Sequence, residues 1–115
     1  MGNAWEVPGG QFSLDAAAET SFRRFIKVNS NGKAEVATAG TDPIVGISYT
    51  DAPAADTPIS IVGCGIAMVE ASETIAAGDF LEPTTGGLAA VADSATSFIA
   101  LTGGAAESLV TVKIG

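Results

Sequence analysis

Residues that could carry out catalysis are few in this sequence, and none of them stands in a catalytic pattern. Cys64 is the only thiol, it lies in an apolar run, and the chain has no histidine that could activate it. A free cysteine in such a run usually behaves as a small buried hydrophobic residue, and one thiol cannot form an intrachain disulfide. We therefore expect Cys64 to be structural, and the lack of a disulfide framework fits assembly in a reducing compartment.

The acidic residues do not form a recognisable site either. Asp51 and Asp56 share a loop, but calcium loops need more ligands at tighter spacing. Glu70 and Glu73 fall near a predicted strand end, where solvated carboxylates are common. The paired glycines are not phosphate loops, because no Gly-Lys-Ser or Gly-Lys-Thr follows them. The sequence predicts no enzyme, no catalytic residue, no metal and no cofactor.

Charge and composition exclude several classes of partner. Five Lys and Arg face thirteen Asp and Glu, for a formal net charge of −8. Binding to phosphates needs clustered cations, so nucleic acid and membrane are not expected partners. No run approaches the ~20 apolar residues that span a bilayer, and the first residues lack the pattern of a secretory signal. No small-molecule substrate is expected.

The pattern of the chain predicts an all-β fold. Short apolar runs alternate with turn residues, and Asn29-Ser30-Asn31-Gly32 is a hairpin-like turn because Asn-Gly supplies positive φ angles. Gly65 is expected to mark a bulge or bend. The spacing predicts a small barrel or sandwich of about 8–9 short strands. The predicted strands lie within 25–28, 33–38, 44–49, 59–64, 66–70, 80–82, 88–91, 98–102 and 109–114.

The chain is expected to have two parts. Residues 1–21 lack a sustained period and are interpreted as an extended N-terminal arm, with one helical turn after Ser13, while residues 22–115 form the β domain. Within that domain, 25–64 and 80–115 form a weak internal repeat, about 55 residues apart. The alignment matches 44–47 with 98–101 and 59–62 with 109–112. Two such halves could close around one core.

Four residues are candidates for contact with a protein partner. Two aromatic residues, Trp5 and Phe12, stand on an otherwise polar, glycine-rich arm. Large aromatic side chains are typical anchors of protein interfaces. Arg23 and Arg24 form the only basic pair, which fits either a solvated strand start or an anchor for acidic groups of a partner. An arm can add a strand to the sheet edge of a neighbour. We expect removal of residues 2–20 to leave the domain folded and to weaken binding.

Motifs of small and apolar residues such as Pro43-Ile44-Val45-Gly46-Ile47-Ser48 and Ile75-Ala76-Ala77-Gly78-Asp79 recur along the β domain, in segments 22–28, 32–37, 43–48, 59–70 and 75–81. These segments together resemble the capsid cement, or head decoration, proteins of tailed bacteriophages. The resemblance covers about residues 22–115 and is a pattern of small and apolar residues rather than a catalytic signature. It implies a virion protein, made in the host bacterial cytoplasm, that binds the outer capsid surface as a homotrimer and stabilises the shell by bridging major capsid protein subunits.

Two other functions remain open at this point. One is a receptor- or glycan-binding β module of a fibre, or another virion assembly protein. A glycan site would need an exposed aromatic cluster, whereas the only candidates, Trp5 and Tyr49, are far apart in sequence. The other is a small trimeric β hydrolase, which would need a water-activating acid in a recognisable motif, and the sequence contains none.

Overall fold

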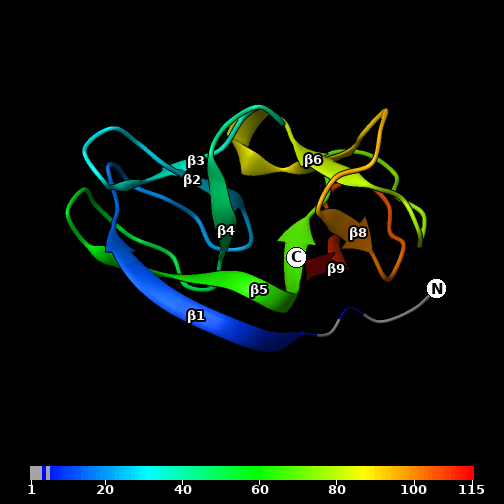
Figure 1. The fold of residues 1–115 in the computed structure, drawn as a ribbon, viewed down its shortest axis with the longest axis horizontal. Coiled ribbons are helices and arrows are strands. Elements are labelled where there is room, and N and C mark those ends of the chain that lie inside the picture. Colours follow the sequence, from blue (N-terminus) through cyan, green and yellow to red (C-terminus); the bar gives the residue numbers. More distant parts are fainter. Residues whose placement is uncertain (1–3, 5) are drawn as a thin grey trace.

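The computed structural model describes residue 4 and residues 6–115, and the fold is all-β as predicted. The described residues form nine strands and one short 3-10 turn, η1 (Thr85–Gly87). Figure 1 shows their arrangement. The strands are β1 (Val7–Asp15), β2 (Phe25–Val28), β3 (Ala34–Val36), β4 (Ile44–Ser48), β5 (Pro58–Glu70), β6 (Leu81–Pro83), β7 (Ala89–Val91), β8 (Phe98–Ala100) and β9 (Leu109–Ile114). Within the described part of the chain, no helix is long and apolar enough to cross a membrane.

Strand β5 organises the molecule, because it pairs with three other strands. The main sheet has the order β3-β2-β4-β5-β9-β8, and β1 also pairs with β5; β6 and β7 form a separate hairpin. The first half of β5 lies between β1 and β4, and its second half pairs with β9. All of these pairings are antiparallel. Figure 1 shows β1 as the outermost strand along one side, next to β5.

The middle of β5 is irregular, at the position where the sequence predicts a bulge or bend. Gly65 has a φ of 99°, which side chains other than glycine rarely adopt. The β1–β5 register also shifts opposite Cys64. Cys64 itself is exposed, so the expectation of a buried thiol is wrong. The reason is local: Gly10 lies across from Cys64 and has no side chain that could cover the sulfur atom.

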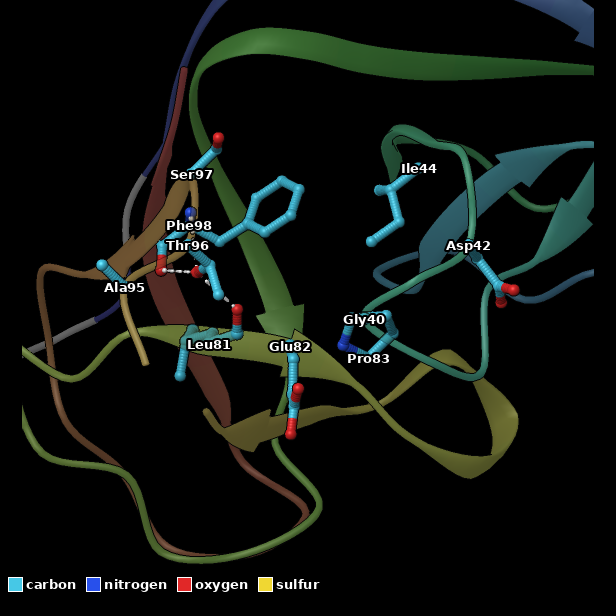
Figure 2. Close-up of a pocket in the computed structure, with 10 residues that line it drawn as sticks. All are labelled: Gly40, Asp42, Ile44, Leu81, Glu82, Pro83, Ala95, Thr96, Ser97 and Phe98. Atoms are coloured by element: carbon cyan, nitrogen blue, oxygen red, sulfur yellow. Dashed lines mark hydrogen bonds between the residues drawn. The ribbon is translucent and has the colours of Figure 1, made fainter. Parts of the chain in front are cut away.

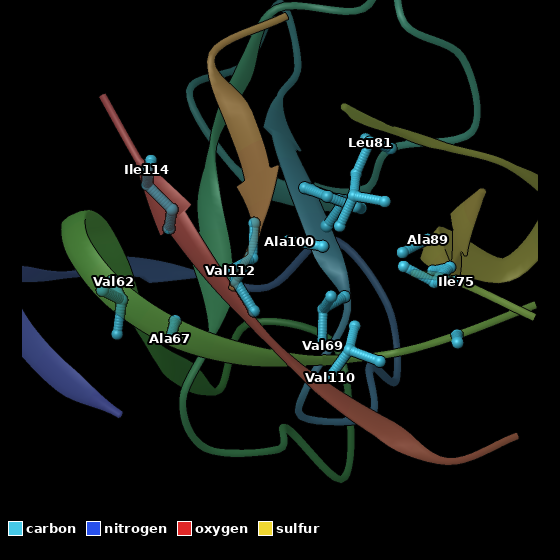
Figure 3. Packing of buried hydrophobic residues seen from close by; sticks show 14 residues of the cluster. Val62, Ala67, Val69, Ile75, Leu81, Ala89, Ala100, Val110, Val112 and Ile114 are labelled. Carbon is cyan, nitrogen blue, oxygen red and sulfur yellow. The ribbon is translucent and has the colours of Figure 1, made fainter. Parts of the chain in front are cut away.

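The core consists of two apolar clusters, which we call the main core and the second core. Figure 3 shows the main core, where residues of β5, β8 and β9 meet Leu81 and Ala89 from the β6–β7 hairpin. Phe25 and Phe98 pack edge to face there, with ring centroids 5.0 Å apart. The second core contains Ala16, Ile26, Ala34, Ala52, Ile59 and Ile61. Each cluster therefore draws on strands far apart in the sequence.

The backbone hydrogen bonds reveal two units with the same connectivity. In each unit a first strand pairs with a last strand, and a hairpin and a further strand lie between them. Unit one runs from β1 to the first half of β5, and unit two runs from the second half of β5 to β9, so β5 belongs to both. Corresponding bridges are Ala16↔Ala34 with Ala71↔Ala89, and Thr20↔Ala52 with Ile75↔Gly104. Corresponding hydrogen bonds are Asn29→Lys33 with Thr84→Leu88, Ala37→Phe25 with Ala92→Phe80, and Asp56→Ala16 with Glu107→Ala71.

These bonds change the residue correspondence within the repeat. Phe25 pairs with Ile47, and the equivalent bridge joins Phe80 to Ile99. Ile47 therefore corresponds to Ile99, two residues away from the alignment drawn by sequence. The correspondence also extends toward the N-terminus, because Leu14↔Ile59 in unit one matches Val69↔Val110 in unit two. Short apolar runs can be aligned in several ways, whereas a hydrogen-bond pattern allows one register.

Part of the segment interpreted as an arm is strand β1. Residues 7–15 pair with residues 58–66 of β5, and Ala16 and Thr20 beyond the strand are buried. The helical turn expected after Ser13 is wrong, because Ser13 and Leu14 pair with β5 in extended conformation. The hydrogen bonds of the adjacent sheet stabilise the strand over a local helical preference.

Candidate functional site

Two of the predicted partner-binding residues, Arg23 and Arg24, line the same cleft. The cleft has a volume of about 380 Å³ and lies where the segment before β2 meets the start of β9. Phe22, 47% exposed, and Leu109, 39% exposed, also line it. Side chains this apolar and this exposed are candidates for contact with a protein partner. The sequence pattern did not single out either of them, because it carries no signal that residues 22 and 109 line the same cleft.

Arg23 is held by groups of its own chain. Its guanidinium pairs with the Glu6 carboxylate and lies 5.1 Å and 5.3 Å from the ring centroids of Phe22 and Tyr49. Such cation–π contacts add to the ion pair. The backbone at Arg23 has a φ of 64°, and the equivalent residue of unit two is Gly78, with a φ of 94°. The Arg23 side chain thus ties Glu6, the residue just before β1, to the segment before β2.

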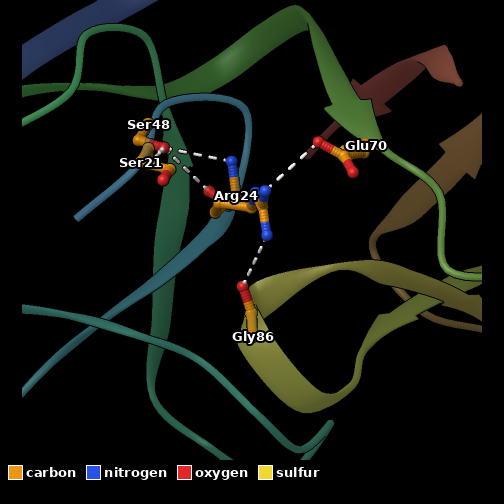
Figure 4. Close-up of polar contacts among 5 residues, drawn as sticks. All are labelled: Ser21, Arg24, Ser48, Glu70 and Gly86. Atoms are coloured by element: carbon orange, nitrogen blue, oxygen red, sulfur yellow. Dashed lines mark hydrogen bonds and ion pairs between the residues drawn. The ribbon is translucent and has the colours of Figure 1, made fainter. Parts of the chain in front are cut away.

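Arg24 bridges the two units of the fold. Its guanidinium donates to the Gly86 carbonyl oxygen and to the Glu70 carboxylate, each at 3.2 Å (Figure 4). Its backbone N–H donates to the Ser48 hydroxyl, which in turn donates to the Ser21 carbonyl oxygen, both at 3.0 Å. These contacts join the segment before β2 to the end of β5 and to the β6–β7 turn. The Arg24 side chain therefore orders one wall of the cleft.

The electrostatics of the cleft do not favour an anionic ligand. Its two arginines face three carboxylates, those of Asp51, Glu70 and Glu107. Because Arg24 pairs with Glu70 and Arg23 pairs with Glu6, much of the cationic charge is neutralised within the chain. The cleft can thus offer apolar contact from Phe22 and Leu109 with polar groups around it, which is the usual arrangement of a protein interface.

Phe12 lies away from the cleft, on the exposed side of β1. It is 40% exposed and its ring covers Gly63 of β5, where a Cβ atom would lie 2.9 Å from the ring. Among the described residues, no strand pairs with the outer edge of β1. Such an edge can accept a strand from another chain. Trp5, the fourth predicted residue, lies outside the described residues.

A second cleft, of about 370 Å³, lies between the loop before β4 and the segment leading into β8 (Figure 2). Its charged side chains are Asp42 and Glu82. The Thr96 hydroxyl donates to the Leu81 carbonyl oxygen at 2.8 Å. This bond joins the segment before β8 to β6 on the unit-two side of the cleft. The described residues contain no group of three or more His, Cys, Asp and Glu side chains that could hold a metal ion.

Asp42 in this second cleft orders its own loop. Its Oδ2 accepts the N–H of Thr38 at 2.9 Å and the N–H of Ala39 at 3.2 Å. The Thr38 N–H holds the pKa of the Asp42 carboxyl below its ordinary value, and the Ala39 N–H and the Lys27 ammonium act in the same direction. The Asp42 carboxylate therefore stabilises this loop in its charged form.

The comparisons with known proteins give a similarity of fold to a solved virion protein. No protein-family model and no curated protein matches the chain. The crystal structure of the head fiber gp8.5 N base in bacteriophage phi29 matches 92% of this chain and 93% of its own chain, with a TM-score of 0.75 and 20% sequence identity. At this identity the similarity establishes a shared fold.

Proposed function

We propose that this chain is a structural protein of a phage virion, which binds the outer surface of the assembled head and stabilises it by bridging subunits of the major capsid protein. The observation that carries the proposal is the fold shared over nearly the whole chain with the head fiber gp8.5 N base of bacteriophage phi29. The proposal includes synthesis in the host bacterial cytoplasm, assembly as a homotrimer and no catalytic activity.

The cleft between Phe22 and Leu109 supplies the contact with the shell in this proposal. Both side chains are apolar and exposed, and both belong to the surface that Arg23 and Arg24 stiffen through ion pairs and hydrogen bonds. A rigid apolar patch loses little conformational entropy on binding, so its burial converts efficiently into affinity. Several such contacts from one trimer would add by avidity.

The first experiment measures binding to expanded empty heads that lack this protein. The purified protein is expected to cosediment with the heads to saturation and to raise the temperature at which they disassemble. Leu109→Asp is expected to weaken binding at least about 10-fold, because it puts a charge into a buried apolar contact. Leu101→Asp is the matched control, since Leu101 is also exposed and lies outside the cleft. Absence of binding by the unmodified protein would refute the proposal.

The predicted anchors on the N-terminal segment need point substitutions rather than a deletion. Removal of residues 2–20 would take away β1 and the buried Ala16 and Thr20, so the domain would not keep its fold. Trp5→Ala tests Trp5 without this loss. Head binding equal to that of the unmodified protein would remove Trp5 from the interface.

A second candidate function is the base of a fibre, and the structural neighbour favours it because that protein is itself a fibre base. In that role the chain would attach a fibre or receptor-binding module to the head. The disassembly temperature separates the two functions. A bridging protein raises it, whereas a fibre base can saturate the heads and leave it unchanged.

A further inference from the structure

The two units of the fold differ in the exposure of one equivalent row of side chains. In unit one, Phe25 pairs with Ile47 and Ile47 pairs with Val62, so these three side chains form a row across three strands. All three are buried in the main core. In unit two the corresponding residues are Phe80, Ile99 and Lys113, which pair in the same way. We call these two sets the buried row and the exposed row.

The exposed row is apolar at two of its three positions. Phe80 is 36% exposed, Ile99 is half-buried, and Lys113 is exposed at the end of the row. A lysine at the rim of an interface can cover apolar surface with its stem and keep its ammonium in water. The exposed row is thus suited to the same kind of contact that the buried row makes.

Unit two itself covers the buried row. The main core joins Phe25, Ile47 and Val62 of unit one to Ala67 and Val69 of unit two. Figure 3 shows Val62 and Ala67 within this cluster, together with Val69. The chain therefore contains one complete example of this interface, in which the row of one unit packs against the first strand of the next.

The first strand of unit one is only partly covered. Phe12 and Leu14 of β1 correspond to Ala67 and Val69 of β5, as their equivalent pairing with Ile61 and Ile59, and with Val112 and Val110, shows. Ala67 and Val69 are 1% and 0% exposed, whereas Phe12 is 40% exposed and Leu14 is half-buried. Leu14 already packs against the second core on one side. Each chain thus presents both halves of the internal interface, an exposed row at one end and a partly covered first strand at the other.

We propose that two copies of this chain associate head to tail, with the exposed row of unit two in one copy packing against Phe12 and Leu14 of unit one in the next. The contact continues between chains the interface that joins the units within a chain. Because its two surfaces differ, it is heterologous and builds a closed ring when the rotation between copies permits. It gives the proposed homotrimer a defined surface and rests on that part of the proposed function.

The test uses the full-length protein without heads, so its result is independent of head binding. Sedimentation equilibrium over a range of concentrations measures the mass of the unmodified protein, Phe80→Asp and Phe12→Asp. Each substitution is expected to weaken association at least about 30-fold, as for the loss of a central interface aromatic. Leu109→Asp, a comparably exposed residue at the other end of β9 from Lys113, is expected to associate normally. Circular dichroism checks that each variant is folded, and Ile99→Thr replaces Phe80→Asp if the latter is not.

A mixture of the two variants tests the head-to-tail geometry. Phe80→Asp keeps an intact first strand and Phe12→Asp keeps an intact exposed row, so the mixture is expected to form a species of two chains although each variant alone is monomeric. A mixture that stays monomeric would overturn the head-to-tail contact. Association that survives both substitutions would overturn it as well. The remaining outcome is that the unmodified protein is monomeric at every concentration and that Phe80→Asp abolishes head binding. That result would overturn the contact between copies and assign the exposed row to the shell instead.

Discussion

At the scale of single residues, the side chains that look most available for a partner are partly used inside the chain. Arg23 and Arg24 are a basic pair in an acidic protein, which suggests anchors for a partner's carboxylates. Both find carboxylates in their own chain, Glu6 and Glu70. Their role at the cleft is therefore to hold its walls, while Phe22 and Leu109 present the apolar surface.

The Arg24 side chain is expected to contribute more to the free energy of unfolding than the other cationic side chains in ion pairs do. Arg24→Met removes the hydrogen bonds to Gly86 and Glu70 and should lower the free energy of unfolding by about 1–2 kcal/mol. Chemical denaturation measures the change. Lys33→Met is the control, because Lys33 pairs with Asp56 at an exposed position and its loss should have no measurable effect. Equal effects of the two substitutions would contradict the bridging role of Arg24.

Asp42 makes one part of the stability depend on pH. Its pKa is lowered by the Thr38 N–H, so the carboxylate stabilises the fold above the pKa of the unfolded chain, and this contribution is lost as the pH falls through the folded pKa. Asp42→Asn should therefore lower the melting temperature at pH 7, and the difference from the unmodified protein should shrink toward pH 3. Thermal melts at several pH values provide the measurement. A difference that does not change with pH would mean that the charge is unimportant.

At the scale of elements, glycines decide where strands can approach one another. A Cβ atom at Gly46 of β4 would lie 2.2 Å from the Val62 carbonyl oxygen and 2.7 Å from Ile61 Cγ2, both in β5. Gly32 also has a positive φ of 77°, but it lies in the β2–β3 turn with open space around it. The two positions separate the cost of crowding from the cost of backbone conformation.

This contrast predicts different effects for the same substitution. Gly46→Ala should cost more than about 3 kcal/mol or prevent folding, because it adds overpacking against β5 to an unfavourable φ. Gly32→Ala should cost only about 1–2 kcal/mol, from the backbone conformation alone. Denaturant unfolding of both variants tests the prediction. A Gly46→Ala variant as stable as Gly32→Ala would show that β4 can move away from β5.

At the scale of the whole molecule, the sharing of β5 couples the two units. The first half of β5 supplies Ile59 and Ile61 to the second core, and its second half supplies Ala67 and Val69 to the main core. The main core also contains Phe25, Ile47 and Val62 of unit one, so unfolding of unit one would remove part of the core of unit two. The two clusters should therefore behave as one cooperative structure.

Ile59→Ala tests this coupling. Ile59 is fully buried in the second core, so truncation should lower the free energy of unfolding by about 2–5 kcal/mol. Calorimetry should still give a single transition, shifted to lower temperature. Val110→Ala at the corresponding position of the main core is the matched comparison. Two separate transitions in either variant would show that the units unfold independently.

The sequence by itself determined the all-β class and the approximate positions of the strands after β1. Alternating apolar residues and turn glycines are local signals, and the Asn29–Gly32 turn follows from them directly: the Asn29 side chain accepts the N–H groups of Asn31 and Lys33, and Gly32 takes the positive φ. The absence of a catalytic or metal-binding pattern in the sequence was equally local information. These features depend on neighbours within a few residues.

Only the tertiary structure decided which segments pair and which side chains are covered. It paired β1 with β5, exposed Cys64 across from Gly10, placed Phe22 and Leu109 in one cleft and set the register of the two units. It also gave equivalent residues of the two units different exposure, since Phe25 is buried and Phe80 is exposed. Each of these outcomes depends on contacts between distant parts of the chain, and a short apolar run carries no information about which distant run will cover it.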